Sequence, residues 1–242
     1  MNHIRISKPL IHMITNDVSR ESCVNIVLAA GGTAICAEGI EEVQEIVDLA
    51  EGLLINIGMS SEKKGKAMEM ALLRAKERAI PVVLDPVGVG ASEFRRNLVQ
   101  RLLDIGGITC IRGNAGEIAT LCHLSVASRG VETGDVHATV EQVQQLSTEN
   151  DAIVMVSGEQ DLLVWKNQVI CKAGGGEVFT RMTGSGCMQS ALLAASIAAS
   201  IDPWQGVQEG VALFDAAGAI ARTTMRGMGS FAVDFMDAIS NS

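Results

Sequence analysis

The sequence predicts an α/β fold in which helices flank a mainly parallel central sheet. Short β-rich apolar runs alternate with longer amphipathic stretches, the order expected of strand, helix and strand units that cover a parallel sheet. Of the 242 residues, 48% are hydrophobic and 19% are charged, which is enough apolar surface to offset the entropy of ordering a core. We expect a single domain over residues 1–242, because no linker, repeat or low-complexity tract interrupts this alternation.

Five apolar runs are predicted to be strands, and helical periodicity occupies the stretches between them. The predicted strands are Thr33–Ala37, Leu53–Ile57, Pro81–Asp85, Ile108–Ile111 and Ala152–Val156. The predicted helices are Glu41–Glu51, Ser61–Arg78, Phe94–Ile105, Ala115–Leu121 and Thr139–Thr148. Because helices separate the strands, we expect the strands to run parallel.

The chain changes character after residue 160. Leu162–Trp165 and Val169–Cys171 flank Lys166-Asn167-Gln168, which predicts a hairpin added to the edge of the sheet. Two long helices rich in small residues follow, at Cys187–Ser200 and Trp204–Met225. Both are nearly apolar on all faces, so we expect both to be buried.

Composition excludes several classes of function. A net charge of -9, with 3% aromatic residues and no tyrosine, argues against a surface that binds nucleic acid. The longest nearly apolar run, Ala191–Ile201, is well short of the ~20 residues that span a bilayer, so we expect no membrane anchor. The six cysteines show no metal-ligand spacing, and no signal-peptide core follows Arg5 and Lys8; a cytoplasmic location is expected.

Ligands of open α/β sheets bind beyond the carboxyl ends of the strands, and two such segments carry charged side chains. Asp85 ends one predicted strand and is followed by a glycine-containing loop, although Asp-Pro is also an ordinary turn. Asn114 and Glu117 open the next helix, a pairing that helix capping alone explains. Capping does not explain Arg112, whose guanidinium beside free helix N–H groups suits a phosphate.

Two later segments add candidates. Ser157 lies in a polar loop after a buried strand, and this loop is equally well explained as a plain connection to the hairpin. The run T-G-S-G-C opens the helix at Cys187, and the amides of Gly184, Ser185 and Gly186 can converge there on an anion. It is not a P-loop, because no Lys-Ser or Lys-Thr follows; close helix packing is the alternative reading.

Cys187 is predicted to be the first residue of that helix. The helix field there lowers a thiol pKa from its usual value of about 8.5, so the thiol could accept a proton. The alternative is a small residue buried beneath the glycine turn.

Taken in this order, the segments resemble the hydroxyethylthiazole kinase family, which has the ribokinase-like three-layer fold. Several ordered motifs at consistent spacing are far more specific than any one alone, and the resemblance covers almost the whole chain. The matching segments are Ile14–Val18 with Asn25 and Leu28–Ala29, Leu54–Gly58, Val83–Ala91, Arg112–Asn114 with Glu117–Ile118, Val156–Glu159, Thr183–Cys187, and Gly229–Phe231 with Phe235 and Asp237–Ala238.

The resemblance implies an activity and an assembly. The activity is phosphorylation of the hydroxyl group of 4-methyl-5-(2-hydroxyethyl)thiazole by ATP with Mg²⁺, a salvage step toward thiamine. The assembly is a homotrimer with the thiazole pocket at the subunit interface. Arg112 and Ser157 would then contact ATP, with Asn114 nearby, while Asp85 and Glu117 would serve the magnesium and phosphate region.

The resemblance also implies roles on the acceptor side. Asn25, Cys36 and Gly184 would belong to the thiazole site, and Cys187 stands where related sugar kinases keep an aspartate base. Cys36 departs from the family, which usually has a methionine there. The smaller side chain could weaken ligand binding by about 1–2 kcal/mol.

Two other functions fit parts of the pattern. A dehydratase of hydrated nicotinamide cofactors occurs on the same fold, but its glycine loop ends in aspartate whereas this one ends in Cys187. A thiazole-binding protein that has lost turnover would also tolerate Cys36. Retention of Asp85, Asn114 and Glu117 argues against that reading.

Overall fold

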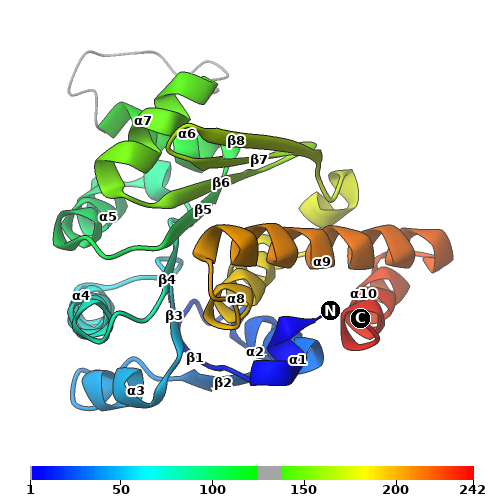
Figure 1. The fold of residues 1–242 in the computed structure, drawn as a ribbon, viewed down its shortest axis with the longest axis horizontal. Coiled ribbons are helices and arrows are strands. Elements are labelled where there is room, and N and C mark those ends of the chain that lie inside the picture. The colour runs from blue at the N-terminus through cyan, green and yellow to red at the C-terminus, as the bar shows by residue number, and fades with distance from the viewer. Residues whose placement is uncertain (1, 125–137) are drawn as a thin grey trace.

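The computed structural model describes residues 2–124 and 138–242, which form a layered α/β structure around one sheet (Figure 1). The strand order is β2-β1-β3-β4-β5-β6-β7-β8, parallel from β2 to β6 and antiparallel from β6 to β8. The strands are β1 Leu10–Ile14, β2 Thr33–Cys36, β3 Gly52–Asn56, β4 Val82–Asp85, β5 Cys110–Asn114, β6 Ile153–Ser157, β7 Gln160–Trp165 and β8 Gln168–Ala173. The predicted mainly parallel sheet and its edge hairpin are therefore confirmed.

Helices cover both faces of the sheet (Figure 1). The α-helices are α1 His3–Ser7, α2 Arg20–Ala30, α3 Val43–Leu49, α4 Glu62–Arg78, α5 Glu93–Ile105, α6 Ala115–Leu124, α7 Val140–Asn150, α8 Ser185–Ala198, α9 Pro203–Thr224 and α10 Met228–Ser240. Two short 3-10 helices, η1 Val89–Ala91 and η2 Glu177–Arg181, lie in the loops that follow β4 and β8.

Each face of the sheet has its own apolar core. On one face, α3 to α7 bury aliphatic side chains against β3, β4 and β5. On the other face, α2, α8, α9 and α10 pack together around a cluster of phenylalanines that includes Phe231 and Phe235. The three layers place the carboxyl ends of the parallel strands at one edge, where the candidate loops meet.

The prediction that both late helices are buried is right for α8 and wrong for α9. In α8, every residue from Cys187 to Ile197 is buried, because the helix lies between the sheet and α9. In α9 only the face toward α8 and α10 is buried, and Ile220 on the opposite face is 56% exposed. An outer helix of small apolar residues has the same composition as a central one, so composition alone did not separate them.

The structure also has elements that the sequence did not predict. Strand β1 and helices α1 and α2 occupy the first 30 residues, and α10 forms the last layer beside α9. Within residues 2–124 and 138–242, no helix combines the length and the apolar character that crossing a bilayer requires.

Candidate active site

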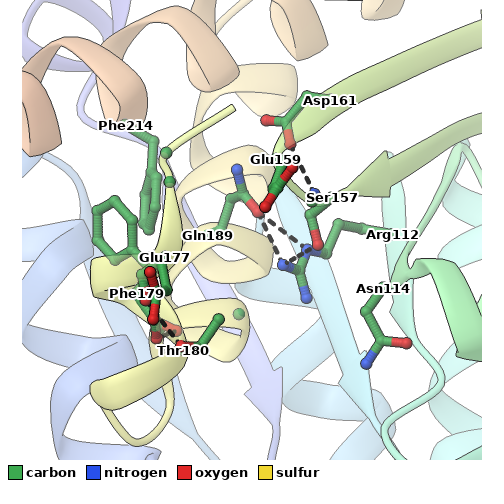
Figure 2. A pocket seen from close by; sticks show the side chains of 15 residues that line it. Arg112, Asn114, Ser157, Glu159, Asp161, Glu177, Phe179, Thr180, Gln189 and Phe214 are labelled. Atoms are coloured by element: carbon green, nitrogen blue, oxygen red, sulfur yellow. Dashed lines mark hydrogen bonds between the residues drawn. The ribbon is translucent and has the colours of Figure 1, made fainter. Parts of the chain in front are cut away.

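A pocket of about 360 Å³ opens at the carboxyl ends of β5 and β6, beside the N-terminus of α8 (Figure 2). It brings together Arg112, Asn114 and Ser157, the three residues that the resemblance assigns to ATP. The other lining residues are Gly158, Glu159, Asp161, Gly175, Gly176, Glu177, Phe179, Thr180, Ser185, Gly186, Gln189 and Phe214. Strands β5 and β6 are neighbours in the sheet, with Asn114 opposite Ser157, which is why these side chains meet.

Arg112 is the cation of this pocket. Its side chain is buried, with 7% exposure, and its three hydrogen bonds within the described residues go to neutral oxygens. Nε and Nη2 donate to Oε1 of Gln189 at 3.1 and 2.8 Å, and Nη2 also donates to Oγ of Ser157 at 2.7 Å. A buried charge held by neutral groups is suited to receive an anion.

The N-terminus of α8 faces this guanidinium. Gly184 caps the helix with φ +78°, and a Cβ at this position would lie 2.8 Å from Cβ of Ser19, so glycine is needed for the turn. The amide of Ser185 already donates to the carbonyl of Met182 at 3.2 Å. Gly186 occupies the first turn, where N–H groups lack an acceptor within the helix and the helix dipole is positive.

Asn114 and Glu117 form the capping arrangement that the sequence predicts. The amide of Glu117 donates to Oδ1 of Asn114, and the amide of Asn114 donates to Oε2 of Glu117, both at 2.9 Å. Oε1 of Glu117 accepts from the amide of Gly88, in the loop after β4, at 2.9 Å. Glu117 therefore ties the start of α6 to the loop that begins at Asp85.

Cys187 lies at the end of a buried polar chain. Nδ2 of Asn16 donates to Sγ of Cys187 at 3.4 Å and to Oδ1 of Asn56 at 3.1 Å. Nδ2 of Asn56 and Oγ of Ser190 each donate to Oδ2 of Asp85 at 2.8 Å. The chain thus connects the thiol on α8 to the carboxylate at the end of β4.

The environment of the thiol corrects two expectations from the sequence. Helix α8 begins at Ser185, so Cys187 is its third residue and not its first. Burial, and next the carboxylate of Asp85, raise the pKa of the Cys187 thiol, although hydrogen bonds from Ser19, Asn16 and Asn56 oppose this in part. The expected lowering by the helix terminus is therefore outweighed, because Cys187 is buried.

Asp85 is buried and only half satisfied. Burial, with a smaller contribution from Glu117, raises its pKa to about 6 against the opposing field of Arg112. Oδ2 has two donors, whereas Oδ1 is buried and has no hydrogen-bond partner among residues 2–124 and 138–242. Mg²⁺ is commonly held by one or two carboxylates together with phosphates and water, so an unpartnered Asp85 oxygen near Glu117 fits such an ion. No group of three or more His, Cys, Asp or Glu side chains that could hold a metal occurs in the described ranges.

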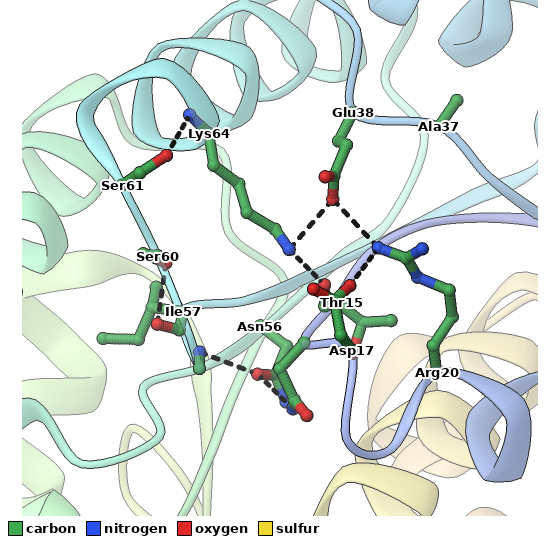
Figure 3. A network of polar contacts seen from close by, with 12 residues as sticks. Thr15, Asp17, Arg20, Ala37, Glu38, Asn56, Ile57, Ser60, Ser61 and Lys64 are labelled. Carbon is green, nitrogen blue, oxygen red and sulfur yellow. Dashed lines mark hydrogen bonds and ion pairs between the residues drawn. The ribbon is translucent and has the colours of Figure 1, made fainter.

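A charged network braces the loops beyond β1 and β2 (Figure 3). Nζ of Lys64, on the first turn of α4, donates to the carbonyl of Thr15 at 2.5 Å and pairs with Glu38 at 2.9 Å. The same Glu38 oxygen lies 3.3 Å from Nη2 of Arg20. Lys64 is buried. The burial of Cys36 raises the pKa of its thiol, and the positive charges of Arg20 and Lys64 oppose this in part. The surroundings of Cys36 are therefore charged, a feature that the sequence did not reveal.

The predicted acceptor-side residues are not all gathered in one place. Gly184 lies against Ser19 in the loop before α2, and Cys36 ends β2 half-buried. Asn25 is exposed on α2, whereas Asn16, which lies in the matching segment Ile14–Val18, contacts the thiol. Asn16, Asn56 and Gln189 were not named as site residues, because a lone amide in an apolar segment gives no periodic signal.

Comparison with known proteins gives a consistent family assignment. A sequence model of the hydroxyethylthiazole kinase family matches residues 1–241. The hydroxyethylthiazole kinases of Nitratidesulfovibrio vulgaris (strain DSM 19637 / Miyazaki F) and Clostridium tetani are 39% and 35% identical to this chain, each over 98% of it and over 89% and 90% of their own lengths.

Solved structures agree. The structure of the hydroxyethylthiazole kinase protein from Pyrococcus horikoshii superposes with a TM-score of 0.88 at 30% identity, covering 99% of this chain and 90% of that one. A ribokinase-like superfamily protein from Enterococcus faecalis, at 13% identity, has a TM-score of 0.70 over 96% of this chain and 85% of its own, which supports the fold. The chain belongs to the hydroxyethylthiazole kinase family.

Proposed function

We propose that this protein transfers the terminal phosphoryl group of ATP to the primary alcohol of 4-methyl-5-(2-hydroxyethyl)thiazole, in thiamine salvage. Family membership supports the reaction, and one structural observation carries the site: the buried Arg112 guanidinium lies against the first turn of α8 in the wall of a pocket. Two independent sources of positive charge at one point suit a nucleotide phosphate.

The pocket suggests how the phosphates are held. Arg112 neutralises charge, the amide of Gly186 donates along the axis of α8, and Ser157 and Gln189 fix the guanidinium. Phosphoryl transfer proceeds through a loose transition state, so positioning and charge neutralisation supply most of the acceleration. Glu159 and Glu177 at the pocket wall are suited to accept hydrogen bonds from ribose hydroxyls.

Cys187 is the residue we assign to the hydroxyl proton. As a thiolate it takes the proton from the alcohol while the new P–O bond forms, and it becomes a thiol in the process. Its raised pKa makes the thiolate a minor species at neutral pH. The raised pKa also makes this thiolate the stronger base, and a loose transition state makes little demand on proton removal, so the minor species suffices. Asn16, which donates to Sγ, holds the thiol in place.

Asp85 and Glu117 are the residues we assign to Mg²⁺. Oδ1 of Asp85 offers a free acceptor, and Glu117 keeps the neighbouring loop in register through Gly88. When bound, the ion would neutralise charge that develops on the phosphates.

The substrate and assembly complete the proposal. We infer a homotrimer with the acceptor site at its interface, as in the family resemblance, and a cytoplasmic location. Val18 and Met59, at the carboxyl ends of β1 and β3, are 65% and 55% exposed, and such large apolar side chains suit a subunit contact. Light scattering should give a mass three times that of one chain; a monomer would contradict the interface.

A coupled assay of ADP release with the thiazole alcohol, ATP and Mg²⁺ tests the reaction. We expect ADP formation that depends on the alcohol, and isothermal titration should detect alcohol binding. Binding without ADP release would indicate a non-catalytic binding protein. ADP release with another alcohol alone would keep the reaction and change the substrate.

A further inference from the structure

The orientation of the Arg112 guanidinium is set from one side. A glutamine amide offers an oxygen and an NH₂ group, and a guanidinium can only donate, so Oε1 of Gln189 must face it. That oxygen accepts from both Nε and Nη2 and so covers one edge of the guanidinium (Figure 2). Ser157 takes a second bond from Nη2.

The remaining nitrogen, Nη1, is turned toward α8. A Cβ at Gly186 would lie 2.5 Å from Nη1, 3.1 Å from Nη2 and 3.2 Å from Cζ, so the guanidinium lies over the first turn of the helix with Nη1 nearest to it. With Nε and Nη2 committed to Gln189 and Ser157, Nη1 is the donor that points to the positive end of α8. An anion placed there meets both Nη1 and the helix terminus.

Gln189 belongs to the same helix as the amides it complements. It lies three residues after Gly186 on α8 and is 4% exposed, so its side chain has little freedom to move. Helix α8 therefore supplies both the backbone donors and the side chain that aims the cation. The backbone donors and the acceptor for Arg112 are therefore fixed relative to each other by one helix.

We propose that Gln189 is a positioning residue for nucleotide binding, which fixes Arg112 so that Nη1 and the N-terminus of α8 hold one phosphate together. The inference rests on the proposed function, because it assigns the phosphate to this pocket. Gln189 itself touches the guanidinium and not the reacting atoms.

Three substitutions test whether Gln189 orients Arg112 for nucleotide binding or only supplies a hydrogen-bond acceptor to a buried arginine. Gln189→Leu removes the acceptor, and we expect the Kd for Mg-ATP, measured by isothermal titration, to rise about tenfold. The KM for the alcohol should change less than about twofold, because the acceptor site is elsewhere. Gln189→Met checks that the loss follows the missing oxygen, and it should behave like Gln189→Leu. The matched control is Ser196→Ala on the same helix, whose buried hydroxyl donates to the carbonyl of Gly206, and it should leave the Kd unchanged.

Gln189→Glu gives the sharpest readout. The carboxylate can keep both bonds to Arg112, but it loses the hydrogen bond between Gln189 and the Asp161 carboxylate, so the melting temperature should not rise. Its negative charge would cancel the guanidinium charge, so nucleotide binding should weaken at least as much as in Gln189→Leu. Unchanged ATP affinity in Gln189→Glu would show that the phosphate does not meet the Arg112 charge, and it would overturn the inference.

A double-mutant cycle tests whether Gln189 acts through Arg112. In an Arg112→Lys background, Gln189→Leu should weaken ATP binding by less than about twofold. A full tenfold effect in that background, or unchanged ATP affinity in Gln189→Leu and Gln189→Met, would overturn the inference. If the unmodified protein binds no ATP, the proposed function itself fails. Failure of the inference about Gln189 would be seen only in the variants, so the two failures are distinguishable.

Discussion

At the scale of single residues, Cys187 carries the most specific chemical expectation. Cys187→Ala should lower kcat by ~10- to 1000-fold, the usual share of a general base, with the KM for the alcohol little changed. Since its pKa is raised, kcat of the unmodified protein should increase from neutral to mildly alkaline pH as the thiolate fraction grows. Steady-state kinetics across pH measure both effects.

Cys187→Asp supplies the control. A carboxylate is ionised across that range, so this variant should stay active and show a flatter pH profile. An alanine variant with unimpaired kcat would remove the thiol from the mechanism.

Asp215, on α9, predicts a pH effect on stability. Burial, and next the carboxylate of Asp161, raise its pKa to about 7, whereas the ordinary value is 3.8. The folded chain thus holds the proton more tightly, so this contribution to stability is complete below pH 3.8 and is lost as the pH rises through about 7. Asp215→Asn should therefore exceed the unmodified protein in free energy of unfolding at pH 8 by about 1–2 kcal/mol, a value reduced for partial exposure.

Chemical denaturation at pH 4 and pH 8 measures this difference. Asp48 provides a control of opposite sign, because hydrogen bonds from Arg74 hold the pKa of that exposed carboxyl below its usual range. Asp48→Asn should gain nothing at pH 8. If the Asp215→Asn difference is the same at both pH values, Asp215 does not titrate as described.

At the scale of secondary-structure elements, the first turn of α8 depends on having no side chain at residue 186. Gly186→Ala would place a Cβ within 2.5 Å of Nη1 of Arg112, so the guanidinium must shift away from the helix terminus. We expect the KM for ATP to rise about tenfold and the melting temperature to fall, because displacing the buried guanidinium costs more than the helix preference of alanine gains.

Gly229→Ala is the matched control, because Gly229 is also in the first turn of a helix, α10, and a Cβ there meets no atom of the described part of the chain within 4 Å. It should leave the KM for ATP unchanged. An unaffected KM in Gly186→Ala would show that the phosphate lies away from Arg112.

Elements differ in how well the sequence predicts them. Strands β3 to β6 and the helices between them were found within a few residues, because each pairs a short apolar run with an amphipathic stretch. Strand β1 was missed: its run, Leu-Ile-His-Met-Ile, contains a histidine that is buried here against the carbonyl of Ala37. Helix α10 was matched only as a terminal segment of the family.

The candidate site likewise contains residues that the sequence could place together and contacts that it could not predict. Arg112, Asn114 and Ser157 could be placed together, since they end adjacent parallel strands. The hydrogen bond between Asn16 and Cys187 joins residues 171 positions apart in the sequence. The hydrogen bond between Arg112 and Gln189 joins residues 77 positions apart. Such contacts depend on how α8 packs on the sheet, which no local pattern specifies.

At the scale of the whole molecule, Arg5 ties the two ends of the chain together. Its guanidinium donates to the carbonyls of Ala29 at 3.0 Å, Ile239 at 3.2 Å and Ser242 at 2.9 Å, and also to that of Ser240. It thus binds the exposed carbonyls at the ends of α2 and α10.

Arg5→Ala should lower the free energy of unfolding by about 1–3 kcal/mol, because several charge-assisted hydrogen bonds are lost at once. Thermal and denaturant unfolding measure the change. Arg74→Ala, which removes exposed pairs with Asp48 and Glu77, is the control and should lower the free energy of unfolding by less than Arg5→Ala does. An equal loss of unfolding free energy in the two variants would show that the hydrogen bonds of Arg5 stabilise the protein no more than an exposed ion pair does.

The same tie means that the chain nearly closes on itself, with both ends on the α10 side of the molecule (Figure 1). A short flexible linker could therefore join them, and new ends could be opened at the exposed Lys166-Asn167 turn between β7 and β8. That circular permutant would place its cut on the edge of the sheet farthest from β2. It should retain the order of the layers while reversing which half of the protein leaves the ribosome first.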